Sequence, residues 1–337
     1  MSATRPGTAL MPMLFGLATS QVVHVAAKLR LPDLVAAGTS DAARLAEETG
    51  TDPAALRRLL RALACLGVLV EDAPGDFAPG PLCDALRSDV PDSLHGMALV
   101  VNGPEAWRSW GRLEYSVRTG LPAWDKVVGT SHFDHLAQHP DEAAVFNAAM
   151  EQFTLAVAPQ IVGAFDFSRS ASVVDVGGGN GTLLAQVLAS APGVRGVLVD
   201  LGAAVVDAPR VFDAAGVADR AEVCVGDFFE HLPEGGSVYL LKSVLHDWDD
   251  EHAVRLLSSC RAAMAGDGAI VVVEPVLPDT AGPAAAGMVM SDLNMLVNTG
   301  GQERTEAEYD ALFTAAGLRL RERTPIGPFD VLVAGAR

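Results

Sequence analysis

A glycine-rich turn between a predicted strand and a predicted helix constrains the fold of this chain more than any other feature. The β-branched run Ser172–Val176 leads directly into the sequence GGGNG at residues 177–181, and a helix is expected over Thr182–Ala189. Glycine lets the backbone adopt a positive φ and approach a ligand closely. The helix N-terminus that follows attracts polar or negatively charged groups. This pattern predicts a ligand-binding turn at the carboxyl edge of an open α/β sheet.

Short β-branched runs alternate with helical stretches from residue 172 onward, which is typical of a parallel sheet with right-handed crossovers. The strands expected in this sheet are Ser172–Val176, Val194–Val199, Glu222–Val225, Val238–Lys242 and Ala269–Glu274. Near the end of the chain, Leu318–Glu322 and Asp330–Ala334 predict an antiparallel hairpin. The Ala-rich tract Gly282–Gly287 predicts a loop.

The first ninety or so residues have the spacing of short helices followed by a small hairpin. The expected elements are helices over Leu17–Leu34, Thr39–Glu48 and Ala54–Leu66 and strands over Gly67–Glu71 and Asp76–Ala78. This order is that of a winged helix, a layout that often binds DNA. However, residues 1–95 hold eight basic and eleven acidic residues, a net charge of −3. DNA-reading modules are usually clearly basic, so we expect a helical module for subunit contacts instead.

Length and charge exclude several classes of protein. The chain has 337 residues, which favours two domains, and its formal charge of −18 argues against nucleic-acid binding. No uninterrupted run of apolar residues reaches the ~18 residues of a membrane span. The four cysteines lie far apart, as expected of reduced thiols in a cytoplasmic protein, and the N-terminal residues do not have the pattern of a signal peptide.

The glycine spacing indicates which ligand the turn holds. A dinucleotide fingerprint, G-x-G-x-x-G, would need a glycine at position 182, which is Thr182. The spacing present is G-x-G-x-G, and Asp175 stands two residues before Gly177. That form resembles the S-adenosylmethionine loop of class I methyltransferases, in which Asp175 would orient the loop or meet the methionine amine. A purely structural turn is the alternative reading.

Polar residues after the next two strands fit a nucleoside. Asp200 ends the second strand of the sheet, and its two oxygens suit the hydroxyls of a ribose. Asp227 and Phe228 follow the third strand. An aspartate can accept a hydrogen bond from an adenine amino group, and an aromatic ring can stack on the base.

A histidine and two glutamates form the candidate catalytic set. His246 and Glu274 follow the fourth and fifth strands, and Glu303 comes from a later glycine-containing segment. A lone histidine is more often structural. A histidine flanked by carboxylates is instead a tuned general base, and this setting favours that interpretation.

The motifs VVDVGGGNG, VLVDL, GDFF, LKSVLHDWDDEHA, IVVVEPVLP and GGQERTEAEY occur in this order along the chain. Together they resemble the plant-type and bacterial small-molecule O-methyltransferases, such as the caffeate, flavonoid and hydroxyindole enzymes and their actinomycete relatives in antibiotic biosynthesis. The segment LRRLLRALACLGVLVE is similar to the dimerisation domain of that family. The resemblance implies a class I methyltransferase Rossmann-like sheet with an N-terminal, mostly helical, winged-helix-like dimerisation domain.

The resemblance also implies roles for individual residues. S-adenosylmethionine would be held by Asp175, Gly177, Gly179, Asp200, Leu201, Asp227, Phe228, Lys242 and Trp248. His246 would be the base, bracketed by Glu274 and Glu303. The aromatic acceptor would contact Phe146, Met150, Phe153, Asn294, Met295 and Asn298. Phe153 departs from several plant members, which have a polar residue there, so the acceptor contacts transfer least well.

The expected organisation is a dimerisation domain over residues 1–95, a helical linker and substrate-pocket region over 96–160 and a catalytic domain over 161–337. The expected assembly is a homodimer that binds a small aromatic substrate and neither nucleic acid nor membrane. No metal is expected, because His135 and His139 have helical ligand spacing without an evident third ligand.

Three other functions stay open on the sequence. The first is N- or C-methylation with the same cofactor. The second is a family member that keeps the cofactor for non-methylating chemistry, such as hydroxylation or decarboxylation. The third is a winged-helix regulator that senses a ligand. The intact set His246, Glu274 and Glu303 favours methyl transfer over the non-methylating chemistry, and it leaves N- and C-methylation open.

Overall fold

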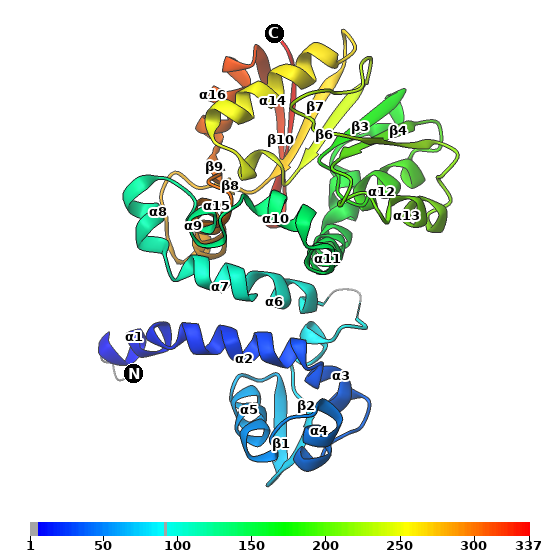
Figure 1. The fold of residues 1–337 in the computed structure, drawn as a ribbon. Coiled ribbons are helices and arrows are strands. Elements are labelled where there is room, and N and C mark those ends of the chain that lie inside the picture. The colour runs from blue at the N-terminus through cyan, green and yellow to red at the C-terminus, as the bar shows by residue number, and fades with distance from the viewer. Residues whose placement is uncertain (1–5, 91–92) are drawn as a thin grey trace. The chain divides into compact units, whose positions relative to one another are not determined.

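The computed structural model describes residues 6–90 and 93–337 (Figure 1). The chain forms two compact units. One runs to Trp107 and includes Ala148–Phe153, and the other comprises Arg108–Asn147 and Thr154–Arg337. The domain boundaries expected near residues 95 and 160 stay a prediction. Among the described residues, no helix is both long enough and apolar enough to span a bilayer.

The first unit opens with helices and a hairpin. Its elements up to residue 101 are α1 (Pro6–Leu14), α2 (Gly16–Lys28), α3 (Leu31–Ala36), α4 (Ala42–Thr49), α5 (Pro53–Cys65), β1 (Leu69–Ala73), β2 (Asp76–Pro79), the 3₁₀ turn η1 (Asp84–Leu86) and α6 (His95–Val101). β1 and β2 pair antiparallel. Leu31, Leu45, Leu60, Leu63 and Phe77 are buried in the core of this unit. The helix–turn–helix and hairpin order expected from the sequence is therefore present.

The single helix expected over Leu17–Leu34 is wrong. The chain breaks between α2 and α3, where Arg30 adopts a left-handed conformation with φ of 52°. The cause is Pro32, which has no N–H to donate and whose ring would clash with the carbonyl four residues earlier in a continuous helix.

Six elements connect the hairpin region to the main sheet. They are α7 (Pro104–Trp110), α8 (Leu113–Thr119), α9 (Ala123–Val128), α10 (His132–Gln138), α11 (Pro140–Ala164) and the 3₁₀ turn η2 (Phe167–Arg169). Pro140 lies in the first turn of α11, where a proline costs no intrahelical hydrogen bond.

A seven-stranded sheet forms the second unit, in the order β10-β11-β7-β6-β3-β4-β5 (Figure 1). The strands are β3 (Ser172–Val176), β4 (Arg195–Asp200), β5 (Ala221–Val225), β6 (Val238–Lys242), β7 (Ala269–Glu274), β10 (Leu318–Ile326) and β11 (Phe329–Ala336). β3 to β7 pair in parallel, whereas β11 pairs antiparallel with both β7 and β10. The predicted parallel sheet and terminal hairpin are confirmed, and the bounds of β3, β6 and β7 are those expected.

The remaining elements of the second unit are α12 (Thr182–Ser190), α13 (Ala208–Ala214), the 3₁₀ turn η3 (Leu245–Asp247), α14 (Asp250–Ala263), β8 (Val276–Leu277), the 3₁₀ turn η4 (Pro283–Ala285), α15 (Ala286–Asn298), β9 (Arg304–Thr305) and α16 (Glu306–Ala315). The loop expected over Gly282–Gly287 is wrong in its second half, since α15 begins at Ala286. β8 and β9 pair in parallel, which the sequence did not predict because each has only two residues.

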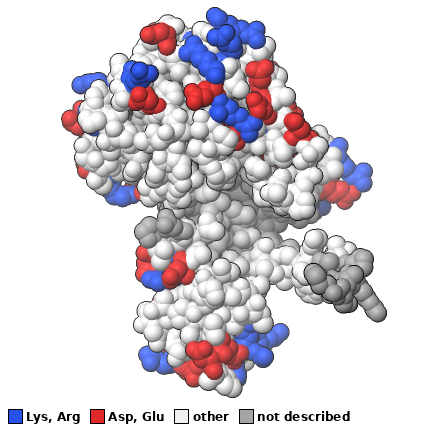
Figure 2. Space-filling model, turned by 180° about the vertical axis from the view of Figure 1, so that it is seen from behind, with Lys and Arg blue, Asp and Glu red and all other residues white. Residues whose placement is uncertain are grey.

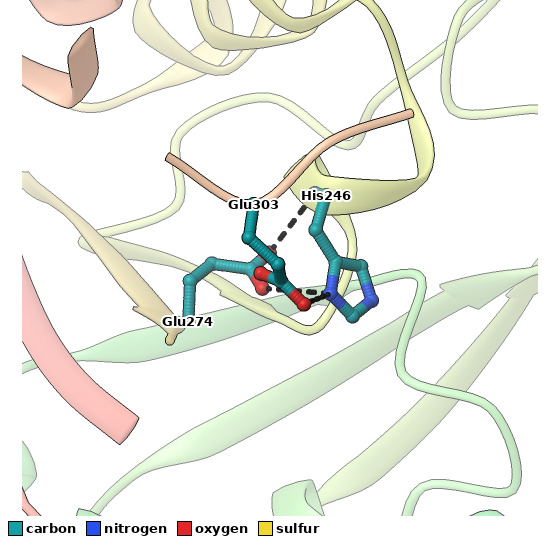
Figure 3. Close-up of side chains that lie close together, drawn as sticks. All are labelled: His246, Glu274 and Glu303. Atoms are coloured by element: carbon teal, nitrogen blue, oxygen red, sulfur yellow. Dashed lines mark hydrogen bonds and ion pairs between the residues drawn. The ribbon is translucent and has the colours of Figure 1, made fainter. Parts of the chain in front are cut away.

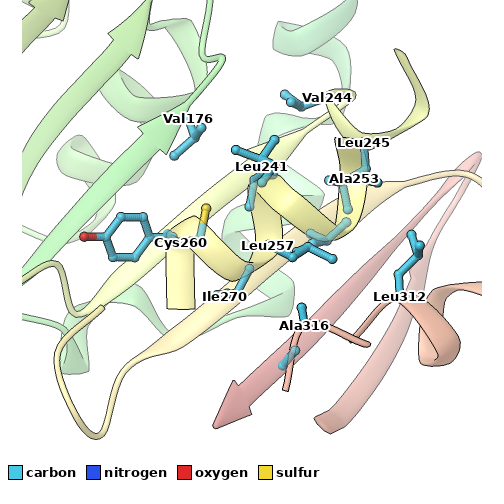
Figure 4. Packing of buried hydrophobic residues seen from close by; sticks show 14 of the residues in the cluster. Val176, Leu241, Val244, Leu245, Ala253, Leu257, Cys260, Ile270, Leu312 and Ala316 are labelled. Atoms are coloured by element: carbon cyan, nitrogen blue, oxygen red, sulfur yellow. The ribbon is translucent and has the colours of Figure 1, made fainter. Parts of the chain in front are cut away.

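The core of this unit packs the sheet against α14 and α16. Leu241 and Ile270 from neighbouring strands lie against Leu257 of α14 in Figure 4. The same cluster includes Val244 and Leu245, which are buried at the end of β6. The residue that follows them, His246, is thus attached to a rigid part of the fold.

Candidate active site

The turn after β3 is a tight glycine loop with one open side. Gly177, Gly179 and Gly181 have left-handed φ angles of 70°, 61° and 77°. A Cβ at Gly178 would lie 2.4 Å from Oδ2 of Asp175, so this position also excludes a side chain. At Gly179, by contrast, no described atom beyond its two chain neighbours lies within 4 Å of where a Cβ would stand. The backbone there is accessible to a ligand.

Two aspartates flank this loop. Asp175 is buried, and its Oδ2 has no hydrogen-bond partner among the described residues. Burial raises the pKa of Asp175 to about 7, and the nearby charge of Asp200 acts in the same direction. Asp200 accepts hydrogen bonds from the N–H of Gly179 at 2.8 Å and of Leu201 at 2.6 Å. The carboxylate of Asp200 therefore ties the glycine loop to the end of β4.

Aromatic rings lie on the other side of the loop. A Cβ at Gly177 would come within 3.5 Å of the ring of Phe228. The rings of Phe228 and Trp248 lie 6.2 Å apart at right angles. Asp227 is exposed, and its Oδ1 accepts a hydrogen bond from the N–H of Phe229 at 2.8 Å. The structure thus brings Gly177, Phe228 and Trp248 together, and it leaves the side chain of Asp227 exposed to solvent.

Lys242 is the last residue of β6. Its Nζ donates a hydrogen bond to Oγ1 of Thr154 at 3.3 Å and lies 5.6 Å from the ring centre of Phe329. Burial lowers the pKa of Lys242 to about 8, although the charges of Glu274 and Asp175 oppose this. The charges of Glu274 and Asp175 therefore interact with the ammonium group of Lys242.

His246 lies between two buried carboxylates (Figure 3). Its Nδ1 is 3.0 Å from Oε1 of Glu303 and 3.5 Å from Oε2 of Glu274. The side chain of His246 is 14% exposed, whereas those of both glutamates are fully buried. In Figure 3 the second ring nitrogen, Nε2, points away from both carboxylates. The three residues predicted as the catalytic set are thus brought together, with one imidazole nitrogen held and the other free.

Glu274 also organises the turn that carries the histidine. Its Oε1 accepts hydrogen bonds from the backbone N–H of Val244 at 2.9 Å, of Leu245 at 2.8 Å and of His246 at 3.4 Å. These are N–H groups that the short η3 turn leaves without intrahelical partners. Glu274 therefore supports both the ring of His246 and its backbone.

Two residues of α15 hold Glu303 in place by hydrogen bonds. Its Oε1 accepts a hydrogen bond from Ser291 at 2.8 Å, and its backbone N–H donates to Oδ1 of Asp292 at 3.0 Å. Because Glu303 cannot rotate away without losing these contacts, its distance to His246 is set by the packing of α15.

The charges around His246 favour its protonated form. Burial lowers the pKa of His246, but the negative charges of Glu274, Asp247 and Glu303 together outweigh burial and raise the pKa to about 10. Burial raises the pKa of Glu274 to about 7, against the positive charge of His246. The group therefore retains a proton at neutral pH, and Nδ1 between the two carboxylates is the favoured place for it.

Arg304 is a site residue that the sequence reasoning missed. It is fully buried and donates to the carbonyl oxygens of Leu245 at 3.0 Å and of Trp248 at 2.8 Å, which lie on either side of His246. Its Nε also donates to Asp250 at 3.0 Å. An arginine in a polar segment is usually exposed, so only its position beside Glu303 in the GGQER motif could have indicated this role.

Two backbone features of the site were also missed. A Cβ at Gly301 would lie only 2.0 Å from the carbonyl oxygen of His246, so this loop packs directly onto the catalytic turn. Ser243 adopts a left-handed φ of 54°, and its Oγ is buried without a partner among the described residues. Such strain in a non-glycine residue is common at functional sites.

The predicted acceptor residues lie on two helices. Asn294, Met295 and Asn298 are on α15, where the amide oxygen of Asn294 accepts hydrogen bonds from Asn298 at 2.8 Å and from Trp110 at 3.1 Å. Phe146, Met150 and Phe153 are on α11, with Phe146 in the second unit and the other two in the first. Their contact with an acceptor stays a prediction.

The histidines at helical spacing are engaged within the protein. Nε2 of His135 lies 3.0 Å from Oε2 of Glu142, and Nδ1 of His139 is hydrogen-bonded to the carbonyl oxygen of His135 at 2.7 Å. The rings of His135 and His139 stack 3.9 Å apart. Both side chains therefore have partners within the protein.

Comparisons with known proteins identify the family. Residues 110–319 match the model of the O-methyltransferase domain, and residues 11–89 match the O-methyltransferase dimerisation domain. The chain is 42% identical to the O-demethylpuromycin-O-methyltransferase of Streptomyces alboniger, over 96% of this chain and 88% of that protein. It is 40% identical to the 8-amino-8-demethylriboflavin N,N-dimethyltransferase of Streptomyces davaonensis, over 91% of this chain and 88% of the relative.

One solved structure of similar fold is that of an enzyme from antibiotic biosynthesis. The O-methyltransferase NcsB1 from neocarzinostatin biosynthesis, in complex with S-adenosylmethionine and 2-hydroxy-5-methyl naphthoic acid, superposes with a TM-score of 0.84 at 35% identity, over 95% of this chain and 96% of that chain. With both of its domains matched by family models, this chain belongs to the S-adenosylmethionine-dependent O-methyltransferase family.

Proposed function

We propose that the protein transfers a methyl group from S-adenosylmethionine to a phenolic hydroxyl of an aromatic secondary metabolite, such as a polyketide or similar antibiotic intermediate, with His246 as the general base. The observation that carries this proposal is the position of the His246 imidazole between two buried carboxylates. Nδ1 of His246 lies between Glu303 and Glu274, which leaves Nε2 free to meet a hydroxyl group.

The residues at the glycine loop fit the cofactor. When bound, S-adenosylmethionine supplies an electrophilic methyl group on a positively charged sulfur. The unpartnered buried oxygen of Asp175 suits an ammonium group, and the open backbone at Gly179 allows a close approach. Asp200 has lone pairs left for ribose hydroxyls, and Phe228 offers a ring for the base. Leu201, Asp227, Lys242 and Trp248 complete the proposed cofactor contacts.

The pKa values explain how His246 would work. A phenol has a pKa of about 10 and an ordinary histidine one of about 6.5, so proton transfer between them costs about 5 kcal/mol in water. With the pKa of His246 raised to about 10, a phenolate beside an imidazolium is close in energy to a phenol beside a neutral imidazole. The two glutamates would thereby stabilise the ionised acceptor. Alignment of the acceptor oxygen would supply a further large part of the rate.

The alternative is methyl transfer to nitrogen, because the relative from Streptomyces davaonensis is named as an N,N-dimethyltransferase. An amine already carries a free lone pair and needs no strong base before it attacks. A phenol does need one. The buried carboxylates around His246 therefore favour an O–H acceptor over an amine.

We propose that the enzyme acts as a homodimer. The chain carries the family's dimerisation domain, and several large apolar residues near the junction of α1 and α2 are exposed in the single chain. Met13 is 74% exposed and Leu17 is 65% exposed. A light-scattering mass near the 35.0 kDa of one chain at micromolar concentration would contradict this.

All four cysteines are unpaired, which supports a reducing, cytoplasmic compartment.

The experiment that tests the function has two steps. Calorimetric titration with S-adenosylhomocysteine should show binding at a single class of sites. Incubation with S-adenosylmethionine and a panel of polycyclic phenols should then add the mass of one methylene group to at least one phenol, and fragmentation should place it on oxygen. Failure to bind S-adenosylhomocysteine would overturn the assignment of the glycine loop. Binding without methylation of any phenol would overturn the acceptor class.

A further inference from the structure

His132 is a half-buried imidazole inside a frame of aromatic rings. It is the first residue of α10, and its ring centre lies 4.5 Å from that of Trp124 and 5.5 Å from those of Phe133 and Phe146. All three contacts are edge-to-face or steeply tilted. Neither ring nitrogen has a hydrogen-bond partner in the described part of the chain, and Nδ1 is buried.

This environment keeps His132 neutral. Burial lowers the pKa of His132 to about 4, and the neighbouring His135 acts in the same direction. The neutral ring offers one donor and one acceptor, and neither is used. His135, three residues later on the same helix, differs because its Nε2 pairs with Glu142. The unpaired nitrogens therefore belong to His132 and not to the helix in general.

A structural role alone does not account for this histidine. A buried polar atom without a partner destabilises the folded state, whereas a phenylalanine would fill the same aromatic frame without that penalty. Trp124 has a buried, unpartnered Nε1–H in the same frame. Two unused hydrogen-bonding groups beside each other indicate a ligand that supplies the missing partner.

The frame around His132 adjoins the proposed acceptor site. Phe146 is a predicted acceptor residue, and it contacts the ring of His132 directly. Phe133 stacks on Trp248 with ring centres 6.3 Å apart and an interplanar angle of 24°. Trp248 stands two residues after His246, in the turn that Arg304 holds. His132 thus packs against rings on both the acceptor side and the catalytic side.

We propose that His132 is a specificity residue that hydrogen-bonds, as a neutral imidazole, to a second oxygen of the aromatic acceptor. The inference rests on the proposed function. It narrows the substrate class to phenols that carry another uncharged oxygen, either a hydroxyl or a carbonyl, besides the one that is methylated. The Nε1–H of Trp124 is only a donor, which favours an oxygen as its partner. A carboxylate would have to lose its hydration among Trp124, Phe133 and Phe146, none of which is charged.

The test compares acceptors that differ in one oxygen. The probes are 1-naphthol, the dihydroxynaphthalene isomers and the hydroxynaphthoic acids, each assayed for kcat/KM with S-adenosylmethionine. The wild-type enzyme should prefer at least one dihydroxynaphthalene over 1-naphthol by about threefold to tenfold, as one neutral hydrogen bond provides. His132→Phe should abolish that preference, and His132→Gln, which keeps a donor and an acceptor, should retain part of it.

Controls separate the possible failures. His139→Gln changes an exposed histidine just after the same helix and should leave the preference unchanged. S-adenosylhomocysteine affinity should be equal in all variants, which shows that each is folded. An unchanged preference in His132→Phe, or a preference for the naphthoic acids, would overturn the inference while leaving the methyltransferase function intact. Methylation of none of the probes would overturn the proposed acceptor class and this inference with it.

Discussion

Oε1 of Glu303 lies 3.0 Å from Nδ1 of His246, although the two residues are 57 positions apart in the chain. The contact exists because the 3₁₀ turn after β6 and the segment after α15 meet at the carboxyl edge of the sheet. Arg304, the neighbour of Glu303, completes the junction by donating to carbonyl oxygens on both sides of His246. His246, Glu303 and Arg304 are therefore joined in one network of hydrogen bonds.

Replacement of the base should remove turnover but not cofactor binding. We expect His246→Ala or His246→Gln to lower kcat by about 10²- to 10⁴-fold, the usual contribution of a general base. S-adenosylhomocysteine affinity, measured by calorimetry, should stay within twofold to threefold, about the scatter of a distant change. Turnover at the wild-type rate in either variant would exclude His246 from the mechanism.

The pH dependence of the reaction should follow the charges around His246. Since its pKa is raised to about 10, the reacting pair must lose one proton before the acceptor ionises, so kcat/KM should rise with pH through the neutral range. Glu303→Gln removes one negative charge and so lowers the pKa of His246. The rising limb of this variant should therefore lie at lower pH, and its plateau should be lower because the imidazolium is less stabilised.

A pH series of kcat/KM for wild-type and Glu303→Gln enzyme, with one phenol of known pKa, checks this. Glu306→Gln is a matched control, because Glu306 is an exposed glutamate that pairs with Arg323 away from His246. A flat wild-type profile, or equal midpoints in wild-type and Glu303→Gln, would contradict the proposed tuning.

The sequence predicted those parts of the fold that local patterns determine. The runs over β3, β6 and β7 are short, mostly apolar and almost entirely buried, and their bounds were predicted to the residue. His246 and Glu274 could be placed together because consecutive parallel strands end at the same edge. Arg304 and His132 could not be found this way. Their roles depend on packing between distant segments, and their residue types suggest solvent exposure.

The glycine loop should depend on Asp200 for its ligand affinity. Asp200 accepts the N–H groups of Gly179 and Leu201, so its removal frees the loop and deletes a proposed ribose contact. We expect Asp200→Ala to weaken S-adenosylhomocysteine binding by about tenfold to a hundredfold, as hydrogen bonds to a charged group provide. Asp219→Ala, an exposed aspartate, is the control for the loss of one charge. Equal affinity of the two variants would contradict the role of Asp200.

The close packing of Gly301 on the catalytic turn leads to the last prediction. A Cβ at this position would lie 2.0 Å from the carbonyl oxygen of His246, so Gly301→Ala must push the turn away from its support. Small displacements of a base from its acceptor cost about a hundredfold in rate, so kcat should fall by about that factor. S-adenosylhomocysteine affinity should change little, because the loop after β3 is not touched.

Gly287→Ala is the matched control for this substitution. Gly287 lies in α15, and outside its chain neighbours and its own helix backbone no described atom stands within 4 Å of its Cβ position, so an alanine there should keep full activity. A loss of kcat in Gly301→Ala together with a large fall in melting temperature would indicate general unfolding instead. Wild-type kcat in Gly301→Ala would show that the turn can shift without cost, and that the junction between Gly301 and His246 does not position the base.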